Sequence, residues 1–302
     1  MTKQTRLHDD DIPVDTDLAR ALMAAQFPQW ADLPIRRVRS AGTVNAIFRL
    51  GDHLVLRIPR AESHTWDLDE LGNAHQWLRW AAPNLPLAIP EPVAICEASD
   101  LYPWPWPVHR WLEGASLDSV DFSSSADTAE RLAEFVVALH RLPAHDGPRS
   151  YEAVSRSTWE PQFRKLLPDL EGVIDTRRAV AAWELTMEAD SWRGPFPWTH
   201  ADLLPGNLIA GHDRLRAVLD FECLGTGDPA LDMSCAWWLF DRPTRDLYRH
   251  AVGADDATWL RAANFALRAV MGIRYYETTN PRFSAMALRA ITEAIDDLVP
   301  AV

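Results

Sequence analysis

The stretch HADLLPGN at residues 200–207 runs directly into LIAGHDRLRAVLDFE at residues 208–222, and together they form the most specific pattern of the sequence. Two short apolar segments flank Gly211-His212-Asp213, a composition typical of a tight turn between paired strands. The pattern therefore predicts a β-hairpin that ends at Asp220. Asn207 immediately precedes the hairpin, so pairing of its strands would bring Asn207 and Asp220 back towards each other.

The residues before the hairpin have the spacing H-x-D-x-x-x-x-N, in which Asp202 and Asn207 are the polar members. Phosphoryl transfer needs little covalent help from a protein and depends on positioning and charge neutralisation. One carboxylate must orient the attacking hydroxyl and accept its proton, while an amide oxygen and a second carboxylate hold Mg²⁺. Asp202, Asn207 and Asp220 supply that set of groups.

Each of these residues also has an ordinary structural explanation. Asp202 could cap a turn, Asn207 could adopt a left-handed conformation before a strand, and Asp220 could end a strand. One such coincidence is common, but three in this order and at this spacing favour the functional interpretation.

The segments HADLLPGNLI and AVLDFECLGTGDPALDMSCAW resemble the paired signature of the aminoglycoside phosphotransferase family, which includes macrolide kinases. The resemblance is specific over residues 198–238 and looser elsewhere. It implies an α+β, bilobal protein-kinase-like fold with a small antiparallel-sheet N-lobe, a mainly helical C-lobe and a nucleotide bound between them. By the same resemblance Asp202 is the catalytic base, and Asn207 and Asp220 are magnesium ligands.

The resemblance also implies the reaction, a Mg²⁺-dependent transfer of the γ-phosphate of ATP or GTP to a hydroxyl of a small molecule. An aminoglycoside or another antibiotic is the expected acceptor, which would make the chain an antibiotic-resistance enzyme. Three alternatives stay open. They are a kinase of a hydroxylated metabolite similar to choline or homoserine, a catalytically silent kinase-like binding protein, and a metal-dependent hydrolase. The hydrolase would use His200, Asp202, Asp220 and Asp228, but the remaining histidines are scattered along the chain.

His200 has two interpretations. Its imidazole titrates near neutral pH and could act as a catalytic acid–base group beside Asp202. In kinase-like folds the equivalent position more often braces the catalytic loop, so we favour a supporting role and keep His200 among the catalytic candidates. We interpret Asp228, which precedes a proline, as a helix N-cap. The resemblance implies that the segment that also contains Asp232 anchors the catalytic loop.

The sequence changes character between residues 114 and 122, where strand-like segments give way to apolar residues at helical spacing. We predict a nucleotide-binding lobe over residues 1–114 and a helical catalytic and substrate-binding lobe over residues 115–302. The first lobe is expected to contain a helix that starts after Asp15, strands at 35–40, 46–50 and 53–58, a turn at Gly51-Asp52, a helix at 66–80, an extended segment at 85–96 and a last strand before Gly114.

A kinase fold places a cation, usually lysine, on its third strand to meet the nucleotide phosphates. Lys3 and Lys165 are the only lysines of the sequence, and neither belongs to that strand. Arg57, in LVLRIP, is therefore the candidate phosphate contact, because its planar guanidinium matches phosphate oxygens. The alternative is a surface arginine on an alternating strand.

The acidic partner of that cation is less regular. In relatives a glutamate stands three residues before a Trp-Leu pair, and Ala74 occupies this position here. Glu70, one helical turn earlier, is the candidate replacement, and Glu62 is a weaker one.

Further nucleotide contacts are expected in two loops. The phosphate-covering loop is predicted at residues 40–45, with Gly42, Thr43 and Asn45 as its contacts and a plain turn as the equal alternative. Trp111 lies in the predicted hinge at 108–114, where it could form a wall against the base or belong to the core.

Composition limits the partners. A net charge of −13 argues against nucleic acid and suits a cationic acceptor, although an acidic surplus often serves solubility alone. Three widely spaced cysteines predict neither a disulfide framework nor a cysteine metal site. No apolar run approaches the roughly 20 residues of a membrane helix, and the N-terminal region lacks an apolar signal-peptide core, so we expect a cytoplasmic protein without a membrane partner.

The acceptor site is expected in the helical lobe. Acidic groups beside aromatic surface favour a cationic polyol, whereas a macrolide-like apolar ligand would fit the aromatic residues as well. Taken singly, each aromatic residue is more typical of a core. The candidates are Asp118, Asp241, Trp237, Trp238, Tyr275, Tyr276, Glu277 and Asn280.

Overall fold

The computed structural model describes residues 12–38, 44–62, 65–144, 147–211 and 214–301. Contacts divide the chain into two compact units. Unit 1 comprises Met1–Asn84 and Ala88–Glu113, and unit 2 comprises Leu85–Leu87 and Gly114–Val302.

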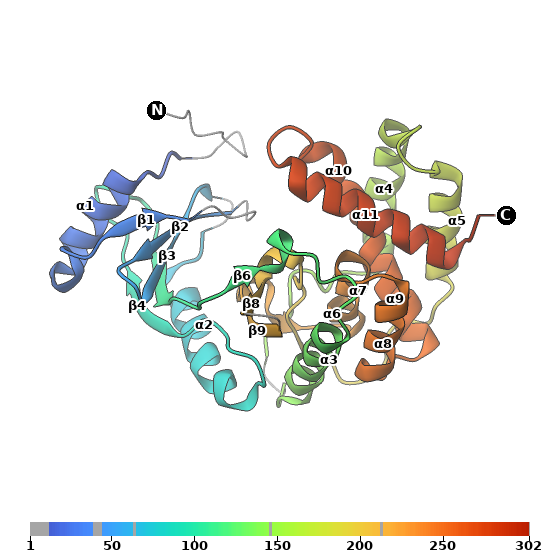
Figure 1. Cartoon of the computed structure of the whole chain (residues 1–302), viewed down its shortest axis with the longest axis horizontal. Coiled ribbons are helices and arrows are strands. Elements are labelled where there is room, and N and C mark those ends of the chain that lie inside the picture. The colour runs from blue at the N-terminus through green and yellow to red at the C-terminus, as the bar shows by residue number, and fades with distance from the viewer. Residues whose placement is uncertain (1–11, 39–43, 63–64, 145–146, 212–213, 302) are drawn as a thin grey trace. The chain divides into compact units, whose positions relative to one another are not determined.

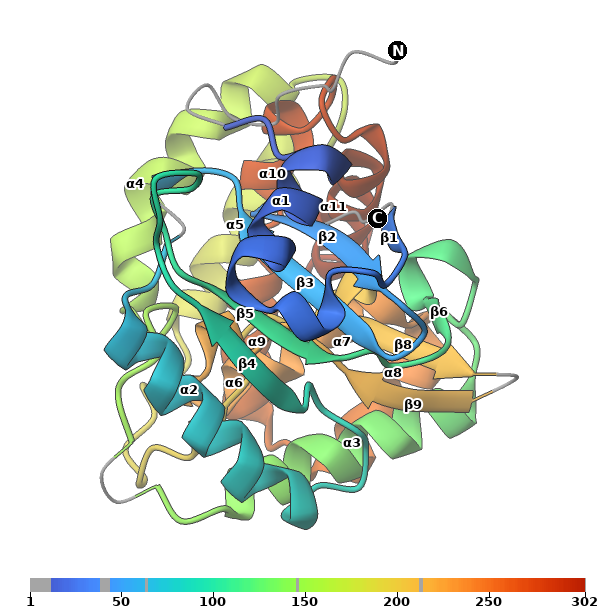
Figure 2. The same ribbon diagram turned by 90° about the vertical axis from the view of Figure 1, so that its left-hand side faces the viewer.

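Unit 1 contains an antiparallel sheet whose strands follow the order β1-β2-β3-β5-β4 (Figure 2). Buried and half-buried residues alternate along β2, the period of two that one covered face produces. A hairpin joins β2 to β3 at Gly51, whose φ of 57° suits a residue without a side chain. The strands are β1 (Ile35–Arg37), β2 (Asn45–Leu50), β3 (Leu54–Pro59), β4 (Pro92–Cys96) and β5 (Trp106–Arg110).

Two helices use opposite sides of this sheet. Helix α1 (Thr16–Gln26) begins at the N-cap Asp15, and its buried residues share one core with Phe48, Leu56 and Val108. Because side chains alternate along a strand, Arg57 and His109 point to the other face. Helix α2 (Leu68–Ala81) meets that face through His75, whose ring lies 5.2 Å from the ring of His109. Short 3₁₀ turns are η1 (Pro28–Trp30) and η3 (Ala82–Asn84).

Unit 2 is mainly helical (Figure 1). Its long helices present apolar stripes to one another, as α3 does when it packs on α8 with Leu132, Phe135, Val136 and Leu139 buried. The helices are α3 (Ala126–Arg141), α4 (Arg156–Leu166), α5 (Thr176–Met187), α6 (Ala230–Met233), α7 (Cys235–Leu239), α8 (Arg242–Val252), α9 (Asp256–Leu267), α10 (Val270–Tyr275) and α11 (Pro281–Leu298). The 3₁₀ turns are η4 (Leu117–Ser119), η5 (Leu167–Leu170), η6 (Pro205–Asn207) and η7 (Phe221–Cys223).

Two small antiparallel sheets interrupt the helices of unit 2. One has the order β6-β8-β9 and the other pairs β10 with β7. The predicted hairpin is confirmed, because β8 and β9 pair from Leu208↔Val218 to Gly211↔Arg214. Its turn residues, His212 and Asp213, lie outside the described residues. The strands are β6 (Ala115–Ser116), β7 (Trp198–Thr199), β8 (Leu208–Gly211), β9 (Arg214–Val218) and β10 (Gly225–Thr226).

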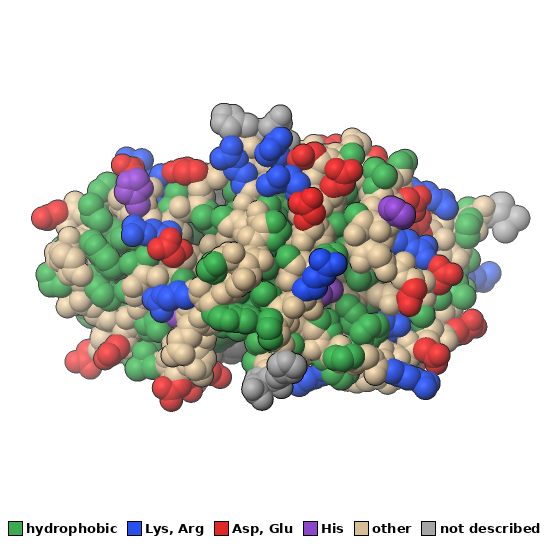
Figure 3. Space-filling view, turned by 90° about the horizontal axis from the view of Figure 1, so that it is seen from below, with side chains coloured by type: hydrophobic (Ala, Val, Ile, Leu, Met, Phe, Trp, Pro, Cys, Tyr) green, Lys and Arg blue, Asp and Glu red, His purple; other side chains and the backbone are tan. Residues whose placement is uncertain are grey.

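The surface mixes charges of both signs. Figure 3 shows acidic and basic side chains interspersed on one face of the molecule, so the net charge of −13 does not gather there into one patch. Within the described ranges, no helix is both long enough and apolar enough to cross a bilayer.

His75 should make unit 1 sensitive to acid. Its ring is buried, and burial lowers the pKa of His75 to about 4 from its usual value near 6.5. Between these values the folded state binds fewer protons than the unfolded chain. The contribution of neutral His75 to the free energy of unfolding is therefore fully present above pH 6.5 and is lost as the pH falls through about 4. A His75→Leu variant should therefore lose less stability over this range, by at most about 3 kcal/mol.

Urea denaturation at a series of pH values would measure this difference. The control is His250→Leu, which removes an exposed histidine from α8. If the free energy of unfolding fell equally between pH 6.5 and 4 in the wild type and in His75→Leu, His75 would not couple folding to pH.

Candidate active site

The loop at residues 200–204 leaves β7 and enters η6, so short secondary structure fixes both of its ends. Strand β7 is held by β10 through the pairs Thr199↔Gly225 and Trp198↔Thr226. Backbone hydrogen bonds from Leu204 to Asp202 (2.9 Å) and from Asn207 to Leu204 (2.9 Å) fold the loop into consecutive turns. The loop therefore has a defined shape before any ligand binds.

Asp202 and Asn207 are in direct contact. The Asn207 side chain donates through Nδ2 to the Asp202 carboxylate at 2.8 Å and to the Asp202 carbonyl at 2.9 Å. Because both hydrogen bonds use Nδ2, the Oδ1 oxygen of Asn207 stays available as a cation ligand. The predicted spacing thus brings a carboxylate and an amide oxygen to one place.

Asp220 joins them at the other end of the hairpin. The Leu219 amide donates to the Asn207 carbonyl at 2.7 Å, which closes the hairpin one residue before Asp220. Asp220 has φ 64° and ψ 71°, a left-handed conformation that is uncommon for a residue with a side chain. Such backbone strain is often found where a side chain must be aimed at a ligand.

The electrostatics of Asp202 and Asp220 suit a divalent cation. Burial raises the pKa of Asp202 well above its usual value, and the charge of Asp220 raises it further. A bound Mg²⁺ would neutralise this concentration of negative charge, and carboxylate and amide oxygens are ligands that it accepts. Among the described residues, no group of three or more His, Cys, Asp or Glu side chains is arranged to hold a metal by itself. A cation here would thus share its coordination with a phosphate or water.

The imidazole of His200 is fully buried, and both of its nitrogens are occupied. Nδ1 accepts from the Asp202 amide at 3.2 Å, and Nε2 donates to the Leu219 carbonyl at 2.9 Å. Burial lowers the pKa of His200, and the ring packs on Phe221 at 4.6 Å between centroids. These contacts describe a neutral ring that connects the loop to the end of the hairpin. The supporting role that we favoured for His200 stays a prediction.

Asp232, on α6, anchors the same loop through hydrogen bonds to its backbone. Its carboxylate accepts from the amides of His200 (3.1 Å) and Ala201 (2.7 Å) and contacts His140 Nε2 at 2.9 Å. Ala201 has φ 63°, so this anchor holds a strained residue next to Asp202. Sequence reasoning identified the anchor segment but gave no sign that His140, on α3, would take part.

Asp228 has a structural role as well. Its carboxylate accepts a hydrogen bond from the Ala230 amide at 3.0 Å and forms a two-point ion pair with the buried Arg261. With Asp228 bound to arginine and both nitrogens of His200 occupied, the set proposed for a hydrolase is not free to ligate metal.

Arg57, in unit 1, lies half-buried on β3 opposite Ile47. Its charge contributes, after burial, to the lowered pKa of His109, so the guanidinium lies on the face of the sheet that α2 meets. Asn45 starts β2 opposite Pro59. Gly42 and Thr43 lie outside the described residues.

Glu70 has a local role that its sequence position did not suggest to us. It is the third residue of α2, and its carboxylate accepts from the Asp67 amide while Asp67 accepts from the Glu70 amide, both at 2.8 Å. This capping box explains Glu70 by itself, and its pairing with Arg57 stays a prediction. The buried polar residue of α2 is instead His75, next to Ala74, and its place in the apolar series Leu71, His75, Leu78 was the signal for it.

Trp111 follows β5, where its amide donates to the His53 carbonyl at 2.8 Å. The Arg49 guanidinium lies 4.7 Å from the centre of the Trp111 ring and is itself paired with Glu113. One face of the ring is therefore covered within unit 1, and its proposed contact with a nucleotide base stays a prediction.

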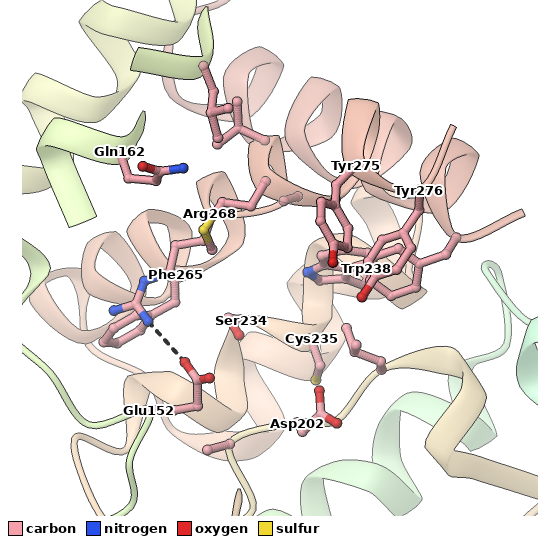
Figure 4. Close-up of a pocket in the computed structure, with 18 of the residues that line it drawn as sticks. Glu152, Gln162, Asp202, Ser234, Cys235, Trp238, Phe265, Arg268, Tyr275 and Tyr276 are labelled. Atoms are coloured by element: carbon pink, nitrogen blue, oxygen red, sulfur yellow. Dashed lines mark hydrogen bonds and ion pairs between the residues drawn. The ribbon is translucent and has the colours of Figure 1, made fainter. Parts of the chain in front are cut away.

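A cavity of about 740 Å³ opens beside Asp202 within unit 2, as Figure 4 shows. Three of the predicted acceptor residues line it: Trp238, Tyr275 and Tyr276. Trp237, which directly precedes Trp238, is instead a core residue whose indole N–H donates to the Asp297 carboxylate at 3.0 Å. Asp241 caps α8, and Asp118 lies 3.7 Å from Arg282 at a smaller neighbouring cavity.

Together, an antiparallel sheet with an arginine on its third strand and a helical unit whose braced Asp-Asn loop leads into a hairpin ending in aspartate define a kinase-like fold. The chain belongs to the phosphotransferase enzyme family, whose sequence profile matches residues 35–265. This match confirms the resemblance drawn from residues 198–238.

Solved structures show the same fold over nearly the whole chain. A GDP complex of aminoglycoside 2'-phosphotransferase-IIIa has a TM-score of 0.67 at 17% identity and covers 94% of this chain and 99% of its own. The apoenzyme of a macrolide 2'-phosphotransferase from Brachybacterium faecium has a TM-score of 0.60 at 20% identity, with 96% and 99% covered. Among curated proteins, no sequence matches the chain significantly.

The anchor role of Asp232 predicts a large loss of stability when its charge is removed. Asp232→Asn replaces one carboxylate oxygen by an amide NH₂ group, so a backbone N–H or the His140 contact loses its buried acceptor. The free energy of unfolding should fall by about 2–4 kcal/mol. The matched control is Asp246→Asn, an exposed position on α8 that should change stability by less than about 0.5 kcal/mol. Urea denaturation would measure both, and equal effects of the two substitutions would contradict the anchor role.

Proposed function

We propose that this chain is a Mg²⁺-dependent O-phosphotransferase that moves the γ-phosphate of ATP or GTP to a hydroxyl of a small molecule. The acceptor we propose is an antibiotic, in keeping with the aminoglycoside and macrolide enzymes that share the fold. The observation that carries this proposal is the position of Asp202, a carboxylate that lines a ligand-sized cavity while Asn207 and the braced loop fix its orientation.

Asp202 is proposed as the base. An acceptor hydroxyl in the cavity would donate its hydrogen bond to Asp202, and the proton would pass to the carboxylate as the oxygen attacks the γ-phosphorus. The bond from the γ-phosphorus to the β–γ bridging oxygen would break, and the nucleoside diphosphate would leave. A carboxyl whose pKa is raised by burial and by Asp220 holds that proton better than an ordinary one. Asn207 and Asp220 are the proposed magnesium ligands. When bound, Mg²⁺ supplies charge neutralisation at the transferring phosphate.

Arg57 is proposed to contact the nucleotide phosphates in place of the usual lysine. Its support is its position on the third strand and the absence of a lysine elsewhere in that strand. GDP and ADP complexes of structures with this fold support a nucleotide donor.

Asp202→Asn tests the base directly. The amide keeps an oxygen that can accept from Asn207 Nδ2, so the loop should survive, but it can no longer take a proton. We expect turnover to fall about 10²–10⁴-fold with nucleotide affinity nearly unchanged. Nucleotide consumption would be measured against aminoglycosides, macrolides and hydroxylated metabolites, with isothermal titration for nucleotide binding.

The controls separate this proposal from its alternatives. Asp246→Asn should keep full turnover. Wild-type levels of turnover in Asp202→Asn would exclude Asp202 as the base. Magnesium-dependent nucleotide binding without turnover on any acceptor would indicate a silent kinase-like binding protein.

Asp220→Asn and Arg57→Ala should weaken nucleotide binding in different ways. Asp220→Asn removes a magnesium ligand, so it should abolish the gain in nucleotide affinity that Mg²⁺ gives the wild type. Arg57→Ala removes a direct phosphate contact and should weaken binding about tenfold or more both with and without Mg²⁺. Titration of nucleotide with and without excess EDTA measures both effects. An unchanged response to Mg²⁺ in Asp220→Asn would refute its role as a ligand.

A further inference from the structure

The cavity beside Asp202 has two chemically different sides (Figure 4). On one side Trp238, Tyr275, Tyr276 and Phe283 form what we call the aromatic wall. Their rings are contiguous, with centroids 5.6 Å apart for Trp238–Phe283, 4.9 Å for Tyr276–Phe283 and 4.7 Å for Tyr275–Tyr276. Aromatic rings bury large apolar areas on binding, so this wall suits a ligand with an extended apolar surface.

On the other side lies the ion pair of Glu152 and Arg268, with a separation of 3.4 Å. The Arg268 side chain is only 8% exposed, and its guanidinium lies 4.3 Å from the Phe265 ring centre and 4.8 Å from that of Trp159. Its Nε and Nη2 atoms are buried and have no hydrogen-bond partner within the described part of the chain. A buried donor without an acceptor is destabilising, and a ligand oxygen placed against Arg268 would supply the missing acceptor.

The charge of the lining is balanced. The described residues that form the cavity include two carboxylates, Glu152 and Asp202, and two guanidinium groups, Arg268 and Arg274. Arg274 is paired with Glu277 at 2.7 Å, and Glu152 is already engaged by Arg268. A ligand with several ammonium groups would bury most of them without an anionic partner, which is strongly unfavourable.

We propose that Arg268, held by Glu152, selects the acceptor, and that the acceptor is an alcohol with a mainly apolar body, an oxygen that accepts from Arg268, and at most one positive charge. This inference rests on the proposed function only in that the cavity is taken as the acceptor site. The sequence left two acceptor chemistries open, a cationic polyol and a macrolide-like apolar ligand, and this inference favours the second.

Two probes distinguish the classes: erythromycin, a large lactone with a single amine, and kanamycin, a compact polycation. Their binding to the full chain is measured by isothermal titration without nucleotide, so the result does not depend on turnover. We expect erythromycin to bind at least tenfold more tightly than kanamycin. Equal or tighter kanamycin binding, or no binding of either probe, overturns the proposal.

Variants test the residues. Trp238→Ala should weaken erythromycin binding tenfold to a hundredfold, as loss of a central aromatic contact does, while Trp80→Ala, an exposed tryptophan of α2, should leave it unchanged. Arg268→Lys keeps the charge but removes the guanidinium donors, and should weaken erythromycin about tenfold without strengthening kanamycin. Unchanged erythromycin affinity in a folded Arg268→Lys or Trp238→Ala variant overturns the assignment of that residue.

A phosphate-transfer assay with ATP or GTP, run beside the titration, separates this proposal from the proposed function. Binding of erythromycin without phosphate transfer to any acceptor tested would contradict the proposed function and leave the ligand preference of the cavity standing. Phosphate transfer to kanamycin in preference to erythromycin would support the proposed function and contradict the acceptor assignment.

Discussion

A single buried carboxylate, that of Asp232, holds the loop that carries Asp202. It accepts from two consecutive backbone amides, those of His200 and Ala201, and contacts His140 on α3. The two N–H groups reach the two oxygens of one carboxylate because the backbone curves around it, and Ala201 contributes to this curvature with a left-handed conformation. The charge of Asp232 therefore stabilises a strained backbone, and that backbone presents Asp202 to the cavity.

The same loop concentrates negative charge where a folded protein would ordinarily avoid it. Burial and Asp220 both disfavour ionisation of Asp202, so the ligand-free site is less stable than a neutral version would be. Proteins accept such local costs mainly at functional sites. Asn207 offsets part of the cost by donating to Asp202, and it does so with Nδ2, which keeps its oxygen for a cation. The geometry and the electrostatics thus favour the same interpretation.

The parts that the sequence predicted are those whose signals are local. Two apolar segments around Gly211 specify a hairpin whatever surrounds them, and the hairpin alone brings Asn207 near Asp220. The capping box of Asp67 and Glu70 was equally local, since the pattern D-x-x-E stands in the sequence, but we assigned Glu70 by analogy with relatives instead. His75 and His109 could not be paired from sequence, because their contact depends on how α2 rotates against the sheet.

The acceptor site shows more clearly what the sequence alone could not predict. Trp237 and Trp238 are adjacent in sequence, yet a helix turns about 100° per residue, and one enters the core while the other lines the cavity. Net charge misleads in a similar way: the chain carries −13, but the lining of the cavity is balanced. Surface charge acts through water and is screened within about 10 Å, whereas a charge that enters a cavity must find its partner there. Under the proposed acceptor assignment, the few groups around Asp202 decide which acceptor binds, and their balance disfavours a ligand with several positive charges, although the net charge of the chain suited a cationic acceptor.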